Sequence, residues 1–275
     1  MELSLETYGF PSGYFVIKNI ATNRLLDVQS NGVEDGTGLI LWPENESSLV
    51  EDMRRPEANN QVFFIDIYGA LCSRSSGHAI DIENDRLVLR HRRPITHPCP
   101  NAFSHPLPRF SYDPETQHIN ITFEVDPTYP NSGNRATAIG NWKDKGYFVT
   151  ALPLRKSRTM MDNASEMFSN AITSPLSLFG SGGHSGPPKG ARPNDIFETG
   201  EFDLMENEIL ETDRSEEGEV DDSPERYRPV RMVGLTKEDE CIIGDKARKR
   251  AQWVVVPIKP VRNRRIVSGG STKSK

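Results

Sequence analysis

Cysteine is scarce in this chain, and long apolar runs are missing. The 275 residues contain three cysteines, Cys72, Cys99 and Cys241, whose odd number and wide spacing fit reduced thiols better than a disulfide framework. The starting segment "MELSLETYGFPSGYF" has no basic stretch followed by an apolar one, and no later run is long enough for a membrane helix. The sequence therefore predicts a cytoplasmic or nuclear protein with no signal peptide and no membrane contact.

Motifs for catalysis and metal binding are also lacking. The chain has no G-x-S-x-G, no H-E-x-x-H and no glycine loop placed between a strand and a helix to hold phosphate. Asp81 and Glu83 share a strand face, but such pairs are more often solvated charges than a general acid and base. Cys99 in "HPCP" lies near His91 without a second Cys or His at zinc spacing. We therefore expect a non-enzymatic protein with no cofactor and no metal site.

Charge is distributed unevenly along the chain. The net charge is −6, yet acidic residues dominate residues 195–225, as in "SEEGEVDDSPE", while residues after 246 are basic, as in "KARKR". This pattern is typical of a solvated acidic loop and a basic tail. Because the chain as a whole is acidic, we do not expect nucleic acid as a partner.

Short strand patterns fill residues 14–154. Segments such as "YFVIKN", "HAIDI" and "HINITFEV" are rich in β-branched and aromatic residues and are separated by Gly, Asn, Asp or Pro. They fall into three similar units that begin near Tyr14, Phe64 and Ser111. The sequence therefore predicts an all-β domain built from three repeats.

These repeats resemble the ricin B-type β-trefoil family. Each repeat of that family ends in Gln-x-Trp, whose aromatic ring packs into a shared core. The first repeat here has Gln61 and Phe63, and the second keeps a ring at Phe110 without the glutamine. The resemblance spans residues 13–154, weakens with each repeat, and implies a β-trefoil of three four-stranded repeats.

The third repeat has no last strand before residue 155, although a trefoil closes by pairing its final strand with its first. The segment "AQWVVVPIKP", residues 251–260, has the tryptophan, β-branched run and terminating proline that such a strand needs. We predict that residues 252–258 pair with residues 14–19, and that Trp253 is the core aromatic of the third repeat.

The predicted organisation has four parts. The segment that interrupts the third repeat is rich in Gly, Ser, Pro and acids and has too few apolar residues for a core. A short helix capped by Thr236 and interrupted at Gly244 is expected just before the closing strand. The parts are the main trefoil at 13–155, a disordered acidic insertion at 156–245, the closing strand at 246–260 and a basic disordered tail at 261–275.

The resemblance also implies a sugar site in the first repeat. In sugar-binding members, an aspartate accepts hydrogen bonds from two adjacent hydroxyls, an aromatic residue stacks on the sugar, and an asparagine before the glutamine donates to another hydroxyl. The matching residues are Asp27, Trp42 and Asn60, followed by Gln61; Asp27 and Trp42 are 42 − 27 = 15 positions apart, the spacing expected for that site. Ile40 departs from the polar residue that the family often has there.

Asp27 has a second interpretation, as a turn aspartate that accepts backbone N–H groups beside a Trp42 that covers the hairpin. The other repeats have lost the pair: Arg90 matches the tryptophan in the second, and in the third we place Gly140 and Thr150 at the two positions. We expect Asp27→Ala to abolish sugar binding and to cost within about 1 kcal/mol of stability.

Two functions remain open. One is a lectin-type module with a single carbohydrate site and a glycan as ligand. The other is an intracellular protein-interaction scaffold whose trefoil binds no sugar and whose acidic insertion recruits a protein partner. Apolar residues among the acids, such as Phe197 and Ile209, are typical of segments that fold on a partner.

Overall fold

The computed structural model divides the chain into two compact units. One combines Met1–Leu152 with Ser223–Lys275, and the other is Pro153–Asp222. Outside the described residues lie most of the predicted insertion, with most of its acidic stretch, and the whole basic tail. The two serines of the insertion that precede a proline, Ser174 and Ser223, also lie there. The structure describes residues 6–99, 101, 104, 106–127, 142–155, 220–221, 228–237 and 243–260.

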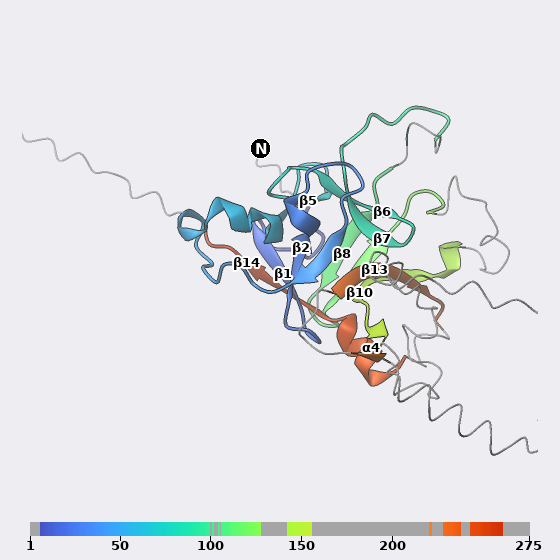
Figure 1. Cartoon of the computed structure of the whole chain (residues 1–275). Coiled ribbons are helices and arrows are strands. Elements are labelled where there is room, and N and C mark those ends of the chain that lie inside the picture. The colour runs from blue at the N-terminus through green and yellow to red at the C-terminus, as the bar shows by residue number, and fades with distance from the viewer. Residues whose placement is uncertain are drawn as a thin grey trace, which may run out of the picture. The chain divides into compact units, whose positions relative to one another are not determined.

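The larger unit consists of three repeats with four strands each (Figure 1). The first repeat contains β1 (Phe15–Asn19), β2 (Leu25–Val28), β3 (Leu39–Trp42) and β4 (Phe63–Ile65). The second contains β5 (Leu71–Ser73), β6 (Ala79–Glu83), β7 (Arg86–Arg90) and β8 (Arg109–Asp113). The third contains β9 (His118–Thr122), β10 (Gly146–Ala151), β13 (Arg228–Leu235) and β14 (Trp253–Pro257).

Short helices connect some of these strands. Three 3₁₀ turns lie in the first repeat, η1 (Gln29–Asn31), η2 (Glu51–Met53) and η3 (Pro56–Gln61), and η4 (Trp142–Asp144) precedes β10. In the smaller unit, β11 (Leu154–Arg155) pairs with β12 (Val220–Asp221). Among the described residues, no helix has the length and apolar character needed to cross a membrane.

The strand pairing defines a β-trefoil. The first and fourth strands of the repeats form a barrel, in which β1 pairs with β4 and β14, β4 with β5, and β8 with β9. The second and third strands form the hairpins β2–β3, β6–β7 and β10–β13. The hairpins meet one another, because β13 pairs with both β3 and β7 and a bridge joins Gly38 to Val88. The predicted fold is confirmed.

One aromatic ring from each repeat lies at the centre of the core. Phe63, Phe110 and Trp253 are all 0% exposed, and each lies at or next to the start of the fourth strand of its repeat. Because an indole N–H needs a partner when it is buried, Trp253 donates from Nε1 to the carbonyl of Val149 at 2.9 Å. The prediction that Trp253 is the third core aromatic is confirmed.

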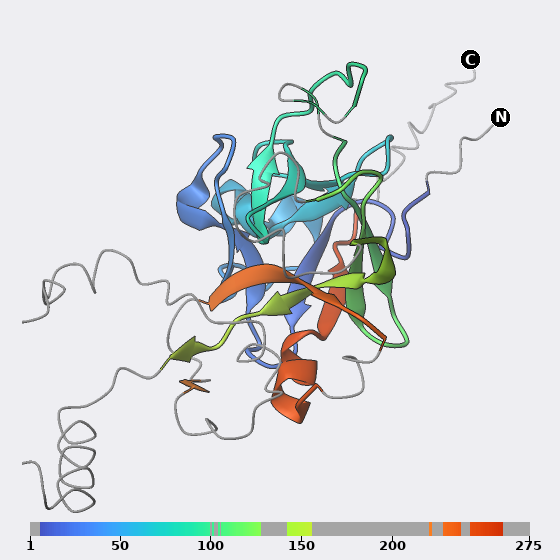
Figure 2. The same ribbon diagram turned by 90° about the vertical axis from the view of Figure 1, so that its right-hand side faces the viewer.

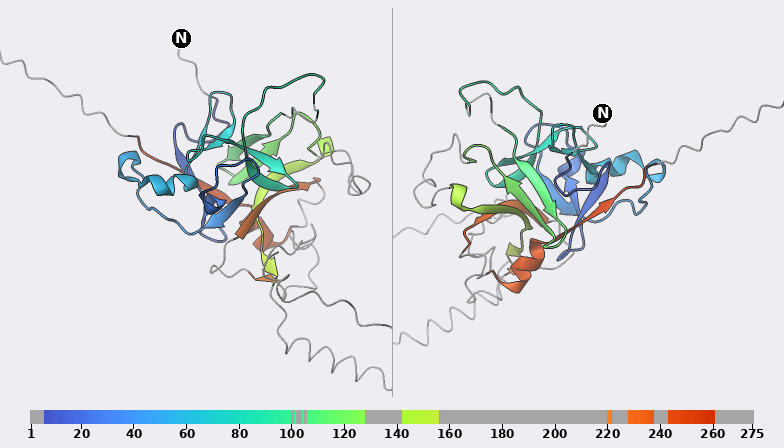
Figure 3. Two further views of the ribbon diagram at one scale, coloured as in Figure 1. Left: turned by 45° about the horizontal axis from the view of Figure 1, so that its top comes forward. Right: turned by 180° about the vertical axis from the view of Figure 1, so that it is seen from behind.

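The closing strand is also confirmed. Strands β14 and β1 pair antiparallel along their whole length, from Phe15 opposite Pro257 to Asn19 opposite Trp253. In the right panel of Figure 3 the two strands run side by side although they lie at opposite ends of the fold's sequence. The buried amide of Asn19 also donates to the carbonyl of Arg250 at 2.8 Å, which ties the segment before β14 to the end of β1.

The predicted end of the insertion is wrong. Strand β13 lies inside residues 156–245 and pairs with β10 from Gly146 opposite Leu235 to Ala151 opposite Val230 (Figure 2). Its side chains alternate, so that Val230 and Met232 enter the core and Arg231 points the other way. The trefoil therefore resumes at residue 228, and the connection between β10 and β13 carries the inserted residues.

A helix lies directly before the closing strand, whereas the predicted cap at Thr236 stays a prediction because residues 238–242 lie outside the described residues. Thr236 directly follows β13, and the helix α4 (Asp245–Arg250) begins only after Gly244, which is its N-cap residue. Its acidic first residue and its basic last turn match the helix dipole. Residues 246–250, assigned to the closing strand, therefore belong to this helix.

Candidate functional site

The hairpin of the first repeat places Asp27 and Trp42 on one face. Leu26 and Val28 of β2 point into the core, and the alternation of a strand turns Asp27 to the opposite face. Asp27 pairs with Ile40 on β3, and Trp42 follows Ile40 by two residues. The side chains of Asp27, Ile40 and Trp42 therefore share the outer face of the hairpin.

The Asp27 carboxylate is buried and held by two amides. Asn60 Nδ2 donates to Asp27 Oδ1 at 2.5 Å, and Gln61 Nε2 donates to Asp27 Oδ2 at 2.7 Å. Both donors come from η3, whose last residues cover the carboxylate and leave Asp27 only 3% exposed. The interpretation of Asp27 as an exposed turn residue bonded to backbone N–H groups does not hold, since its hydrogen-bond donors are buried side-chain amides.

Gln61 connects the site to the chain that follows β3. Besides its bond to Asp27, its Nε2 donates to the carbonyl of Pro43 at 2.8 Å, and its Oε1 accepts from the backbone N–H of Asn45 at 3.0 Å. Gln61 is 0% exposed and does not line the pocket described below. It positions the carboxylate and Asn45, whereas the resemblance implied a residue of the binding site itself.

Burial raises the pKa of Asp27, because a carboxylate loses its hydration there, and the hydrogen bonds from Gln61 and Asn60 act in the opposite direction. The two amides nevertheless stabilise the ionised form. The group is thus a fixed hydrogen-bond acceptor whose orientation is set by its two neighbours.

A pocket of about 340 Å³ opens beside this carboxylate. Trp42, 42% exposed, forms part of its wall. Asn60 lines it as well, and its Oδ1 is buried without a hydrogen-bond partner. The lining residues are Asp27, Val28, Gln29, Ser30, Asn31, Ile40, Trp42, Asn45 and Asn60.

The structure thus brings all four predicted residues together, with Asp27, Trp42 and Asn60 on the pocket and Gln61 behind it. Sequence reasoning missed Asn45 and the turn at Gln29–Asn31. Ser30 and Asn31 have positive φ values of 54°, a conformation for which asparagine is one of the more tolerant residues. Asn31 followed by Gly32 was the available signal for such a turn.

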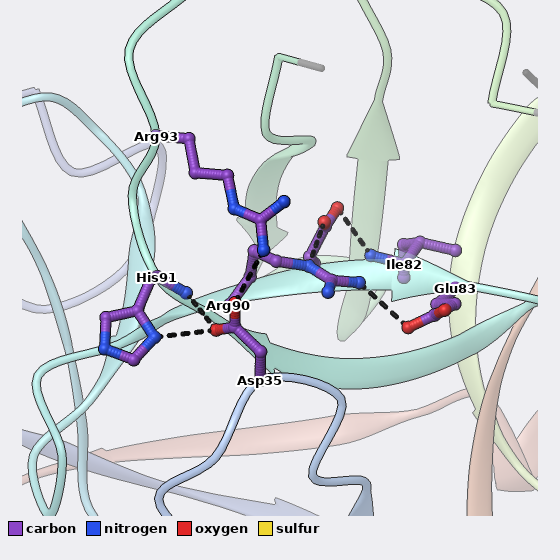
Figure 4. Close-up of polar contacts among 7 residues, drawn as sticks. Asp35, Ile82, Glu83, Arg90, His91 and Arg93 are labelled. Atoms are coloured by element: carbon purple, nitrogen blue, oxygen red, sulfur yellow. Dashed lines mark hydrogen bonds and ion pairs between the residues drawn. The ribbon is translucent and has the colours of Figure 1, made fainter. Parts of the chain in front are cut away.

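The second repeat closes the equivalent position with an ion pair. Asp81 on β6 occupies the place of Asp27, because it pairs with Val88 as Asp27 pairs with Ile40. Arg90, in the place of Trp42, donates from Nε to Asp81 Oδ2 at 3.1 Å, and its second bond reaches Glu83 at 2.8 Å (Figure 4). One carboxylate oxygen of Asp81 is therefore already bonded to an arginine, and the aromatic ring is absent.

The third repeat has neither group. Thr150 of β10 pairs with Arg231 and so occupies the position of Asp27, while Val233 occupies that of Trp42. The sequence alignment placed Gly140 at the acidic position and Thr150 at the aromatic one, and this is wrong because the partner of β10 is the distant β13. Gly140 lies outside the described residues.

No family model matches the chain, and no curated protein matches its sequence. Among solved structures it is similar to the C-half of an earthworm R-type lectin in complex with GalNAc, with 17% identity over 51% of this chain and 78% of that chain and a TM-score of 0.31. It is also similar to the mdaA-1 domain, with 14% identity over 94% and 97% of the two chains and a TM-score of 0.40. The β-trefoil assignment rests on the strand order and register of this chain itself.

Proposed function

We propose that the first repeat is a lectin-type module that binds one sugar residue in the pocket beside Asp27. The observation that carries the proposal is the Asp27 carboxylate, held by Asn60 and Gln61, next to the exposed ring of Trp42 in the same pocket. The second and third repeats have no such pair, so binding is confined to the first.

The chemistry suits a vicinal diol. A carboxylate oxygen has two lone pairs, and each oxygen of Asp27 uses one for an amide, which leaves one on each for a sugar hydroxyl. The indole of Trp42 is a rigid flat surface for the apolar face of a sugar. Asn60 lines the pocket as well and holds the Asp27 carboxylate in place beside it. Ile40 adds apolar contact between them.

The competing interpretation is that Asp27, Asn60 and Gln61 only fasten η3 to β2. Both interpretations explain the hydrogen bonds, but the structural one gives no role to an indole that is exposed on the pocket wall. Replacing Trp42 therefore separates them, because this side chain has little part in the core.

The test is a titration of the full-length ¹⁵N-labelled chain with galactose, mannose and N-acetylgalactosamine, preceded by a glycan array. We expect weak binding of at least one sugar, with shifts confined to the pocket residues, because a single site gains no affinity from multivalency. Trp42→Ala should lower the affinity about tenfold or more, which is about 1.4 kcal/mol.

Tyr68→Ala is the matched control, because Tyr68 is an exposed aromatic, 70% accessible, that does not line the pocket. Its affinity should equal that of the unchanged chain. Shifts that avoid the pocket, or equal losses in both variants, would contradict the proposal.

A further inference from the structure

Three side chains of types that can bind metal ions come from separate parts of the sequence and meet beside the second repeat. Asp35 lies in the loop between β2 and β3, His78 just before β6, and His91 just after β7. One ligand atom of each lies within 4.8 Å of those of the other two. Their separation in sequence explains why no motif indicated them, since 78 and 91 do not have the spacing of a zinc motif.

The two histidines are close together without bonding to each other. Their ring centroids are 3.7 Å apart at an interplanar angle of 46°. The Nδ1 atom of His78 is buried and has no hydrogen-bond partner, which is unusual for a buried polar atom. No described protein group therefore fixes the orientation of the His78 ring through this nitrogen.

Asp35 is already oriented toward this place. Its Oδ1 accepts the backbone N–H of His91 at 2.6 Å and lies 2.8 Å from His91 Nδ1, while Arg93 donates to Oδ2 at 2.9 Å (Figure 4). Partners of this kind fix the orientation of a ligating carboxylate. The guanidinium on Oδ2 leaves Oδ1 facing the imidazoles.

We propose that Asp35, His78 and His91 form a site for one divalent transition-metal ion such as Zn²⁺. Two imidazole nitrogens and a carboxylate oxygen are ligands that this ion prefers, and they leave a fourth position for water. Tetrahedral bonds of about 2.0–2.1 Å separate ligand atoms by roughly 3.3 Å. The distance between Asp35 Oδ1 and His91 Nδ1 is 2.8 Å. A small rotation of the His91 side chain, which is 61% exposed, brings it to that value.

Neighbouring charges limit the affinity without excluding the ion. Arg90 is bound to Asp81 and Glu83, so its charge is largely neutralised. Arg93 keeps a positive charge on the cluster, which makes the site weaker than a closed structural zinc site. The bound ion would fasten the β2–β3 loop of the first repeat to both strands of the β6–β7 hairpin at its open end.

The test is calorimetric titration of the full-length chain, without a polyhistidine tag, with ZnCl₂, together with Co²⁺ absorption spectra. We expect one ion per chain with a dissociation constant on the order of micromolar. His78→Gln and His91→Gln should each weaken binding about tenfold or more, and the melting temperature of the unchanged chain should rise with Zn²⁺.

His97→Gln is the matched control, because His97 is an exposed histidine outside the cluster, and its affinity should be unchanged. Melting without metal identifies any variant that fails to fold. No stoichiometric binding by the unchanged chain, or full affinity in the His78→Gln/His91→Gln double variant, would show that Asp35 and His91 form only a hydrogen bond that fastens the loop.

Discussion

The carboxylate of Asp27 is the acceptor for two buried side-chain amides, so removing it also affects Asn60 and Gln61. In Asp27→Ala, the Nδ2 of Asn60 and one hydrogen of Gln61 Nε2 would lose their acceptors in a buried place. An unsatisfied buried donor costs about 1–3 kcal/mol, so we expect a loss of this size, above the 1 kcal/mol limit predicted for an exposed turn. Urea unfolding measures it, with Trp42→Ala as a control that should stay within about 0.5 kcal/mol. An unchanged midpoint for Asp27→Ala would contradict the buried network.

The raised pKa of Asp27 gives the site a defined pH dependence. Because the folded state binds this proton more tightly than the unfolded state, the contribution of Asp27 to stability is present below its unfolded pKa and is lost as pH rises through the folded pKa. Sugar affinity should change in the opposite sense, since protonation removes an acceptor. We expect affinity to fall as pH drops through a value above the ordinary aspartate pKa. A carbon-detected NMR titration of the Asp27 carboxyl group gives that value, and a pKa at or below the ordinary one would contradict the prediction.

Trp253 should be among the most sensitive residues of the core. It is fully buried, and its N–H is bonded to Val149. Trp253→Ala should lower the free energy of unfolding by about 3–5 kcal/mol through lost contacts and a cavity. Trp253→Phe, which restores the ring type found at Phe63 and Phe110, should recover part of that loss. Chemical denaturation measures both, and equal losses would mean that the ring does not fill the core.

The sequence could indicate that Asp27, Trp42, Asn60 and Gln61 lie together, but not which of them line the pocket and which lies behind it. The resemblance to the ricin B-type family indicated them; alternation puts Ile40 and Trp42 on one face of β3, and Asp27 joins that face only through the register of β2 against β3. The role of Gln61 depends on Pro43 and Asn45, which reach it only through the path of an irregular loop. His78 and His91 likewise meet only because β6 and β7 pair.

At the level of elements, the sequence predicted β14 because β1 needs a partner strand, but it did not predict β13. β14 has a continuous β-branched run and a terminating proline, both visible in sequence. β13 reads "RPVRMVGL", with two arginines and a proline among its apolar residues, and its hairpin partner β10 ends at residue 151. A hairpin whose turn is replaced by a long insertion gives no local turn signal.

Hydrogen exchange tests the closure of the barrel. Backbone amides of β1 and β14 that lie in their shared ladder should exchange only by global unfolding, because opening this seam exposes the core. Amides in the loop 29–38 should exchange much faster. Exchange of β14 at the rate of that loop would show that the seam opens independently.

At the level of the whole molecule, the corrected boundary changes which deletion should be tolerated. Removing residues 156–219 and joining Arg155 to Val220 through Asn-Gly preserves every described strand, since these two residues already pair and a two-residue turn can connect them. We expect a soluble protein with cooperative unfolding. Calorimetry of the shortened chain measures this.

The matched control extends the deletion to residue 235 and removes β13. Val230 and Met232 would then leave the core, and β10, β3 and β7 would lose a partner strand. We expect an insoluble or molten product. Cooperative unfolding of this longer deletion would contradict the assignment of β13 to the trefoil. The scaffold function of the acidic segment remains a prediction from sequence, which the shorter deletion also tests through the loss of a binding partner.

The pairing of β1 with β14 also determines when the barrel can close during synthesis. Phe15 is made early, but its partner Pro257 follows only after 257 − 15 = 242 further positions. At about 5–20 residues per second, β1 waits roughly 10–50 s on the ribosome for its partner. Throughout that interval an apolar strand edge is open to other nascent chains, so production of this protein should depend on chaperones that shield such edges.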